Sequence, residues 1–327
     1  MIVSLRRLAP RLGALALAAS VAACNFAGAS APADPGAATR PLLVATTRAP
    51  AADPGAPPFF GAERGPGLAF AQATLAPPQT TLFASLSPFD ADWRVVGVGP
   101  VVRSEPAQAF ARAAIGRDVM IYVHGYRETF ETAASGAAEL ADGVGFRGAT
   151  GLFTWPSGGA TFDYGYDRES ALWSRDALEE LILTLAQSES GGRVHIVAHS
   201  MGSLLTLETL RFVRASGGDA AMARIGAVVL ASPDVDIDLF AQAVERLGVD
   251  AQKITVITAQ NDRALELSRR LAGGVVRAGA ADRARLEGLG VTVADASEFG
   301  EGVLNHDLFL RDPDVRAVVT RAIERAR

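Results

Sequence analysis

The sequence predicts an α/β protein with one mostly parallel sheet and helices on both faces. From Asp118 onward, short and solidly apolar runs alternate with segments that carry apolar residues at helical spacing. With 49% hydrophobic residues and a formal net charge of −5, the 327-residue chain can bury a large core. No internal repeat is evident, so we expect a single domain over residues 42–327.

Each predicted strand is an apolar or β-branched run that ends at a turn residue. In chain order the expected strands are Leu42–Thr47, Gly67–Leu75, Arg94–Val102, Val119–Val123, Gly151–Trp155, Val194–Ala198, Ile225–Ala231, Ile254–Thr258 and Val291–Ala294. The amphipathic intervals predict helices over Glu128–Ala141, Ser170–Gln187, Ser203–Ala215, Ile237–Leu247 and Arg263–Leu271. Gly143 and Gly248 fall where helix C-caps use glycine.

The interval between Ala231 and Ile254 has room for only one helix and its loops. A lid domain inserted at this place would need more chain. We therefore expect a fold without a lid domain, and a site open to large or surface-bound substrates.

The N-terminus is predicted to be an export signal over residues 1–23. Arg6, Arg7 and Arg11 precede the apolar stretch 12–23, which is too short to span a bilayer. Val21-Ala22-Ala23-Cys24 resembles a bacterial lipoprotein processing site, and Cys24 is the only cysteine, so an intramolecular disulfide cannot explain it. An ordinary cleaved signal that contains a cysteine is the alternative.

Lipidation at Cys24 would anchor the protein in the cell envelope. Asn25, rather than Asp, follows this cysteine, which by resemblance favours the periplasmic face of the outer membrane over the inner membrane. Residues 24–41 are rich in Ala, Pro and Gly and are expected to form a flexible tether. Acidic and basic residues are interspersed without a basic patch, so the sequence does not predict nucleic-acid binding.

Ser200 is the candidate nucleophile. The apolar run that starts at Val194 ends in Ala198-His199-Ser200-Met201-Gly202 and is followed by a helical pattern. A serine on a sharp strand-to-helix turn needs small residues two positions before and two positions after it.

A serine nucleophile needs a base and a carboxylate that orients the base. Of the four histidines, His306 is the only one C-terminal to Ser200, which agrees with the order Ser, acid, His. Asp262, after the strand predicted at Ile254–Thr258, is the favoured acid, although it could instead be a helix N-cap. Asp234, after the preceding strand, is the alternative acid, and Asp236 is expected to cap the next helix.

Two backbone N–H groups are expected to form an oxyanion hole. One belongs to Met201, directly after the nucleophile. The other belongs to Tyr126, because Val119–Val123 leads into His124-Gly125-Tyr126 one βαβα unit before the serine. The sequence contains no metal-binding motif and no phosphate-binding glycine loop, so no metal and no cofactor are expected.

Together these stretches resemble bacterial α/β hydrolases of unassigned substrate, which are related to esterases and lipases and are often exported, sometimes as lipoproteins. The resemblance covers most of residues 118–310. It rests on Tyr122–Tyr126, Phe153–Ser157, Tyr166–Ser170, Ser174–Leu178, Ala198–Gly202, Ser232–Asp236 and Asn261–Leu265. It implies an α/β-hydrolase fold and a serine-hydrolase triad, and it implies no particular substrate.

The expected function is hydrolysis of carboxylic esters, including lipid-like esters, by a Ser–His–Asp triad at a membrane surface. Two alternatives remain at this point. An acyltransferase would use the same triad, and a non-catalytic envelope binding protein would retain the fold without turnover.

Overall fold

The computed structural model describes residues 39–53, 55–78, 92–159, 163–188, 191–271, 273–299 and 306–326. The predicted signal, Cys24 and nearly all of the predicted tether lie outside these residues. The tether was expected to extend to residue 41, but the first strand already begins at Arg40.

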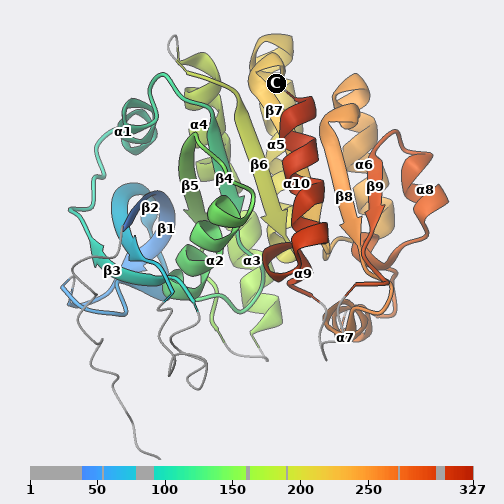
Figure 1. Ribbon diagram of the computed structural model, residues 1–327, viewed down its shortest axis with the longest axis horizontal. Coiled ribbons are helices and arrows are strands. Elements are labelled where there is room, and N and C mark those ends of the chain that lie inside the picture. The colour runs from blue at the N-terminus through green and yellow to red at the C-terminus, as the bar shows by residue number, and fades with distance from the viewer. Residues whose placement is uncertain are drawn as a thin grey trace, which may run out of the picture. The chain divides into compact units, whose positions relative to one another are not determined.

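In the described part of the chain, nine strands form one sheet in the order β3-β2-β1-β5-β4-β6-β7-β8-β9 (Figure 1). The strands are β1 Arg40–Pro50, β2 Phe60–Ala76, β3 Arg94–Val98, β4 Val119–Val123, β5 Ala149–Thr154, β6 Val194–His199, β7 Ile225–Ala231, β8 Ile254–Thr258 and β9 Thr292–Asp295. β1 to β3 pair antiparallel at one edge, whereas β1 and β5 and all later pairs are parallel. The predicted mostly parallel sheet is confirmed.

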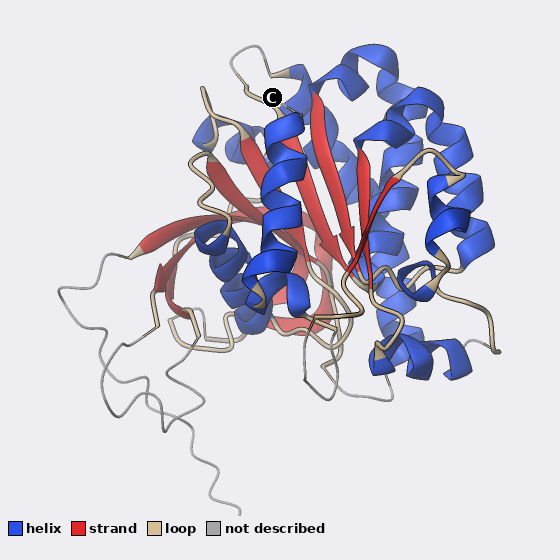
Figure 2. Cartoon of the chain, turned by 45° about the vertical axis from the view of Figure 1, so that its right-hand side comes forward, coloured by secondary structure: helices blue, strands red, loops and turns tan. Residues whose placement is uncertain are grey.

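Helices cover both faces of the sheet (Figure 2). They are α1 Pro106–Ala113, α2 Phe130–Gly143, α3 Tyr164–Trp173, α4 Arg175–Gln187, α5 Met201–Arg224, α6 Ile237–Leu247, α7 Arg263–Leu271, α8 Arg283–Glu287, α9 Leu308–Arg311 and α10 Pro313–Arg325. The buried side chains of α1, α4, α5 and α6 pack in one core. Those of α2, α9 and α10 pack in the core on the other face.

The predicted helix Ser170–Gln187 is wrong in one respect, because two helices, α3 and α4, meet at Ser174. Ser174 is buried, and its hydroxyl contacts the Ser170 carbonyl at 2.8 Å and the Thr47 hydroxyl of β1 at 2.8 Å. A side chain that bonds to the backbone four residues earlier favours a bend in a helix.

The expected C-cap at Gly143 is also displaced. Gly143 is the last residue of α2, and Gly145 has the positive φ of 62°. Gly248 does end α6 with a φ of 59°, as expected.

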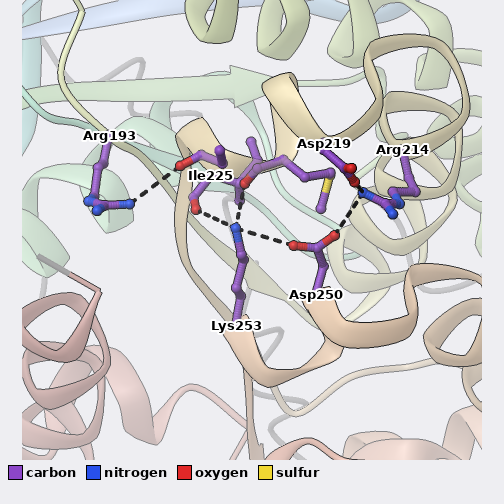
Figure 3. A network of polar contacts seen from close by, with 8 residues as sticks. Arg193, Arg214, Asp219, Ile225, Asp250 and Lys253 are labelled. Carbon is purple, nitrogen blue, oxygen red and sulfur yellow. Dashed lines mark hydrogen bonds and ion pairs between the residues drawn. The ribbon is translucent and has the colours of Figure 1, made fainter.

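The C-terminal end of α5 is closed by a polar network around Lys253, the only lysine in the sequence (Figure 3). Its ammonium group donates to the carbonyls of Met222 and Ile225 and lies 3.3 Å from Asp250 Oδ1. Asp250 Oδ2 lies 3.3 Å from Arg214. The last carbonyls of a helix have no partners within the helix, and cations there also complement its dipole.

The order of the strands determines where a site can form. The chain passes from β4 outward to β5 and then returns to place β6 on the other side of β4. In open α/β sheets, ligands bind at the carboxyl ends of the strands where the direction of winding changes in this way. The loops after β4 and β6 meet at that point, and they carry His124-Gly125-Tyr126 and Ser200.

Candidate active site

Ser200 occupies a strained turn between β6 and α5. Its φ of 50° and ψ of −119° lie outside the usual regions for a residue with a side chain. Backbone bonds hold the turn: Ser200 N–H donates to Ala231 O at 2.9 Å, and Ser200 O accepts from Asp234 N–H at 3.1 Å. The local strain is therefore supported by the loop after β7.

Gly202 is required by close packing at this turn. A Cβ atom added to Gly202 would collide with the carbonyl oxygens of Val123 and His124 at the end of β4. Backbone atoms cannot move aside as a flexible side chain can. The small residue after the serine therefore allows α5 to start directly against β4.

Gly125 brings the loop after β4 into contact with the serine. A Cβ atom added there would lie 3.0 Å from Ser200 Cβ and 2.9 Å from His199 Nδ1. The loop after β4 therefore lies directly against the candidate nucleophile, where an oxyanion donor would be needed.

His124 orients the next peptide. Its Nε2 accepts the Trp155 N–H at 3.1 Å, so the proton of the neutral ring is on Nδ1, which donates to Gly125 O at 2.9 Å. The N–H of Tyr126 points opposite to this carbonyl, because the peptide is trans. Burial is the main reason that the pKa of His124 is well below its usual value, so the ring stays neutral. Trp155 stacks on it at 4.8 Å and is fully buried, which makes it a core residue.

Asp262 has two functions in the structure, one for each of its oxygens. Oδ1 accepts the N–H groups of Ala264 and Leu265 at the start of α7, at 2.9 and 3.1 Å. Oδ2 accepts the Nδ1–H of His306 at 2.6 Å. The capping role and the contact with histidine, which the sequence left as alternatives, therefore coexist.

His306 is also held against the Ser200 turn by His199. The Nε2–H of His199 donates to the His306 carbonyl at 3.0 Å, and the two rings lie 4.6 Å apart. Burial, followed by the charge of His306, lowers the pKa of His199 to about 3. His199 is therefore a neutral donor at neutral pH.

Within the described residues, no hydrogen bond joins Ser200 Oγ to His306. Because Nδ1 of His306 is bonded to Asp262, Nε2 is the ring nitrogen that remains for the serine. Contacts between nucleophile and base are often long without substrate and shorten when substrate binds.

Asp234, the alternative acid, lies in a different cluster. Its Oδ1 is 3.1 Å from Arg277 Nε and accepts from Ser268 at 2.5 Å, while Oδ2 accepts from Tyr164 at 3.1 Å. Asp234 and Arg277 are both buried. These contacts engage both carboxylate oxygens of Asp234, at the start of the loop that leads to α6. Asp236 caps α6 as expected.

Two buried charged residues near the site were not singled out from the sequence. Arg48, at the end of β1, contacts the loops after β4 and β5, and Asp167 in α3 contacts the same loops. Asp167 lies within the stretch Tyr166–Ser170 noted for its family resemblance, and that was its only signal. Arg48 follows an apolar strand, where an arginine ordinarily indicates a solvent-exposed end.

The described residues contain no cluster of His, Cys, Asp and Glu that could hold a metal ion. They also contain no helix with the length and hydropathy required to cross a membrane. Residues 232–253, all of them described, contain α6 and the short 3-10 helix Gly248–Lys253 between β7 and β8, without an inserted domain.

The sheet order and the strained serine turn define an α/β hydrolase. Residues 106–326 match the sequence model of a protein family described as "Alpha/beta hydrolase of unknown function". The chain belongs to this family. The predicted fold and the expected family relationship are thereby confirmed.

Other comparisons found more distant or shorter likenesses. An uncharacterized protein of Nostoc sp. is 38% identical over 58 residues, which cover 18% of this chain and only 15% of that protein. An uncharacterized protein from Bacillus cereus has 15% identity and a TM-score of 0.42, and the match covers 65% of this chain and 60% of that one. Lipase B of Aspergillus fumigatus has 15% identity and a TM-score of 0.38, and the match covers 66% of this chain and 57% of that one. With TM-scores below 0.5, these structural likenesses carry no weight, and the assignment rests on the family match.

Proposed function

We propose that this α/β hydrolase cleaves carboxylic esters, with Ser200 as nucleophile, His306 as general base and Asp262 as the carboxylate that orients His306. The observation that carries the proposal is the 2.6 Å contact between Asp262 and His306, whose carbonyl is bonded to the residue preceding Ser200. His306 is thus bonded to Asp262, 44 positions earlier in the sequence, and to His199, which lies 107 positions earlier and directly before Ser200.

In the proposed reaction, Ser200 Oγ attacks the ester carbonyl carbon while His306 Nε2 accepts the hydroxyl proton. The backbone N–H groups of Met201 and Tyr126 stabilise the negative oxygen of the tetrahedral intermediate. The carbon–oxygen bond to the alcohol breaks, and His306 returns the proton to the leaving oxygen. Water, deprotonated by His306, then attacks the acyl-enzyme and releases the acid and free Ser200.

A fluorophosphonate probe tests the nucleophile, because it reacts with an activated serine. We expect it to label the wild-type protein and Ser203→Ala, and we expect Ser200→Ala to remain unlabelled. Ser203 is a matched control, since it is a buried serine in the first turn of α5 whose hydroxyl contacts the Ala198 carbonyl. A folded wild-type protein without labelling would favour a non-catalytic binding protein and overturn the proposal.

The acceptor in the second step distinguishes a hydrolase from an acyltransferase. We expect hydrolysis of a short-chain ester panel in water, with little transfer when a primary alcohol is added. Transfer to the alcohol as the dominant reaction would assign the same residues to an acyltransferase.

We further propose that a lipid at Cys24 holds the enzyme at a membrane of the cell envelope, favouring the outer membrane and lipid-like esters. The support comes from the N-terminal sequence, with its basic start, short apolar stretch and single cysteine. Cys24→Ser is expected to move the protein from the membrane fraction to the soluble fraction. Continued membrane association of that variant would contradict lipidation.

A further inference from the structure

Arg48 is a buried arginine whose donors are used almost entirely on backbone carbonyls. Its Nη2 donates to Glu128 O at 2.6 Å, and Nη1 donates to Gly61 O at 3.0 Å and to Ser157 O at 3.4 Å. Glu128 lies in the loop after β4, and Ser157 lies in the loop after β5. One guanidinium group therefore holds both loops by their carbonyl oxygens.

Asp167 holds the same two loops by their N–H groups. Its Oδ2 accepts from Arg127 N–H at 3.1 Å, in the loop after β4, and from the Ser157 hydroxyl at 2.5 Å. Its Oδ1 accepts from Gly158 N–H at 2.7 Å. Asp167 is fully buried in α3. The two charges thus contact neighbouring backbone groups, at 127 and 128 on one loop and at 157 and 158 on the other.

These contacts flank the peptide that carries the Tyr126 N–H. Arg127 has a φ of 64°, a left-handed conformation that is costly for a residue with a side chain. Its N–H bond to Asp167 and the adjacent Glu128 carbonyl bond to Arg48 support this conformation. The two residues that follow Tyr126 are therefore held in place by Asp167 and Arg48.

A second connection reaches the same peptide through His124, which precedes it in the chain. Arg48 Nε donates to the Thr154 hydroxyl at 2.9 Å, and this hydroxyl lies 3.1 Å from His124 Nε2. His124 in turn donates from Nδ1 to Gly125 O. The carbonyl of the Gly125–Tyr126 peptide is thus connected through two side chains to the same buried arginine.

Stability alone is a weak reason for this arrangement. Burying a guanidinium group without a directly bonded carboxylate is expensive, and apolar residues of similar size often stabilise a fold better. Burial lowers the pKa of Arg48 to about 10 and raises the pKa of Asp167, which reflects that cost. Directional bonds to two loops give instead a fixed geometry, which oxyanion donors require.

We propose that Arg48 and Asp167 are positioning residues that fix the Gly125–Tyr126 peptide as an oxyanion donor for Ser200. This inference rests on the proposed esterase function. It assigns a role to residues that do not touch the reacting atoms themselves.

Two substitutions test the inference at different severity. Asp167→Asn places an amide where two N–H groups need acceptors. Thr154→Val is nearly isosteric and removes only the hydroxyl between Arg48 and His124, so it is expected to leave the fold intact. Asp250→Asn is the matched control, because it also neutralises a buried carboxylate, but at the opposite end of α5 (Figure 3).

The measurements are kcat and KM for a short-chain ester and the inhibition constant of an alkyl boronic acid, which forms a tetrahedral adduct on serine. Losing one oxyanion donor costs about 10²–10³-fold in kcat. We expect about 10–100-fold losses of kcat for Thr154→Val and Asp167→Asn, with KM within about twofold and boronate inhibition weakened in parallel. Asp250→Asn is expected to keep the wild-type kcat and inhibition constant.

The outcomes separate this inference from the proposed function. If the wild-type protein hydrolyses esters, and both Thr154→Val and Asp167→Asn keep the wild-type kcat and boronate affinity, the positioning role is wrong and the esterase function stands. The role is also wrong if kcat falls while boronate affinity is unchanged. If the folded wild-type protein neither reacts with fluorophosphonate nor hydrolyses esters, the function and this inference fail together.

Discussion

The carboxylate of Asp262 joins the start of α7 to the ring of His306, with one oxygen bonded to each. An N-capping carboxylate is held by backbone N–H groups and has little freedom to rotate. The position of the His306 ring therefore depends on where α7 begins. A change in this helix is expected to affect catalysis through the orientation of the histidine.

Replacing the two candidate acids should affect different quantities, kcat for Asp262 and the free energy of unfolding for Asp234. Asp262→Asn is expected to reduce kcat by about 10³–10⁴-fold, because an amide cannot stabilise the imidazolium or enforce its tautomer. Asp234→Asn is expected to lower the free energy of unfolding by about 3 kcal/mol, because it leaves the buried Arg277 without its charge partner, while kcat changes by less than about tenfold. Steady-state kinetics and urea unfolding of both variants check this. Comparable small losses of kcat would show that the acid has been misassigned.

The pKa of His199 predicts a loss of stability in acid. Its pKa in the folded protein is about 3, and its usual value is 6.5, so the unfolded chain binds the proton first as the pH falls. The contribution of His199 is complete above about pH 6.5 and decreases by about 2 kcal/mol between pH 7 and pH 5. His124 acts in the same direction, since its pKa is also lowered.

His199→Gln tests this prediction, because glutamine can donate to the His306 carbonyl but does not titrate. Urea unfolding at pH 5 and pH 7 should show a smaller difference for this variant than for the wild type. An unchanged difference would contradict a depressed pKa at His199.

Gly202→Ala should distort the turn that carries Ser200. The added methyl group meets the carbonyl oxygens of Val123 and His124, so we expect about 1–3 kcal/mol of destabilisation together with at least tenfold lower kcat. Gly165→Ala is the control, because no atom lies within 4 Å of an added Cβ there and alanine favours the helix by about 0.5–1 kcal/mol. Thermal unfolding and ester hydrolysis would measure both effects. A Gly202→Ala protein with wild-type kcat would contradict the close approach of α5 to β4.

Lys253→Met should reduce stability without changing catalysis. The substitution removes a cation from the C-terminal carbonyls of α5 and from Asp250, and we expect a loss of about 1–2 kcal/mol. Arg283→Met, which removes an exposed ion pair with Glu287, is expected to have little effect. Urea unfolding compares the two variants. A Lys253→Met protein as stable as the wild type would show that the network adds nothing to the free energy of unfolding.

Much of the sheet was predictable because its strands are buried on both faces. The bounds of β4, β7 and β8 agree with the apolar runs at Val119–Val123, Ile225–Ala231 and Ile254–Thr258. Strands of this kind are recognisable from composition, since apolar and β-branched residues dominate and charged residues are absent. The bounds of α6 and α7 agreed as well, because a capping aspartate precedes each helix.

The helix α10 was not predicted, although its sequence carries a helix signal. Asp312 caps its start and Pro313 is its first residue, and its buried residues include Val315, Val319 and Ile323 at helical spacing. The predicted strand Arg94–Val102 is shorter than expected, and Val102 forms only an isolated bridge with Phe70.

The contacts of Arg48 and Asp167 could not be derived from sequence alone. Arg48 reaches Glu128 and Ser157, which are 80 and 109 positions away, and such contacts leave no periodic pattern. The bond between His199 and His306 was missed for a related reason. It joins residues that are 107 positions apart in the sequence.

The single lysine of the sequence, at the last position of the 3-10 helix Gly248–Lys253, gives this chain a simple response to lysine-specific proteases. An endoprotease specific for lysine has one cleavage site, after Lys253, whose ammonium group is engaged with two carbonyls and Asp250 in the folded protein. Cleavage requires the chain around that site to open, because a protease binds its substrate in an extended form. The rate of this single cut therefore reports how often the junction between the 3-10 helix Gly248–Lys253 and β8 opens, without any label or substitution.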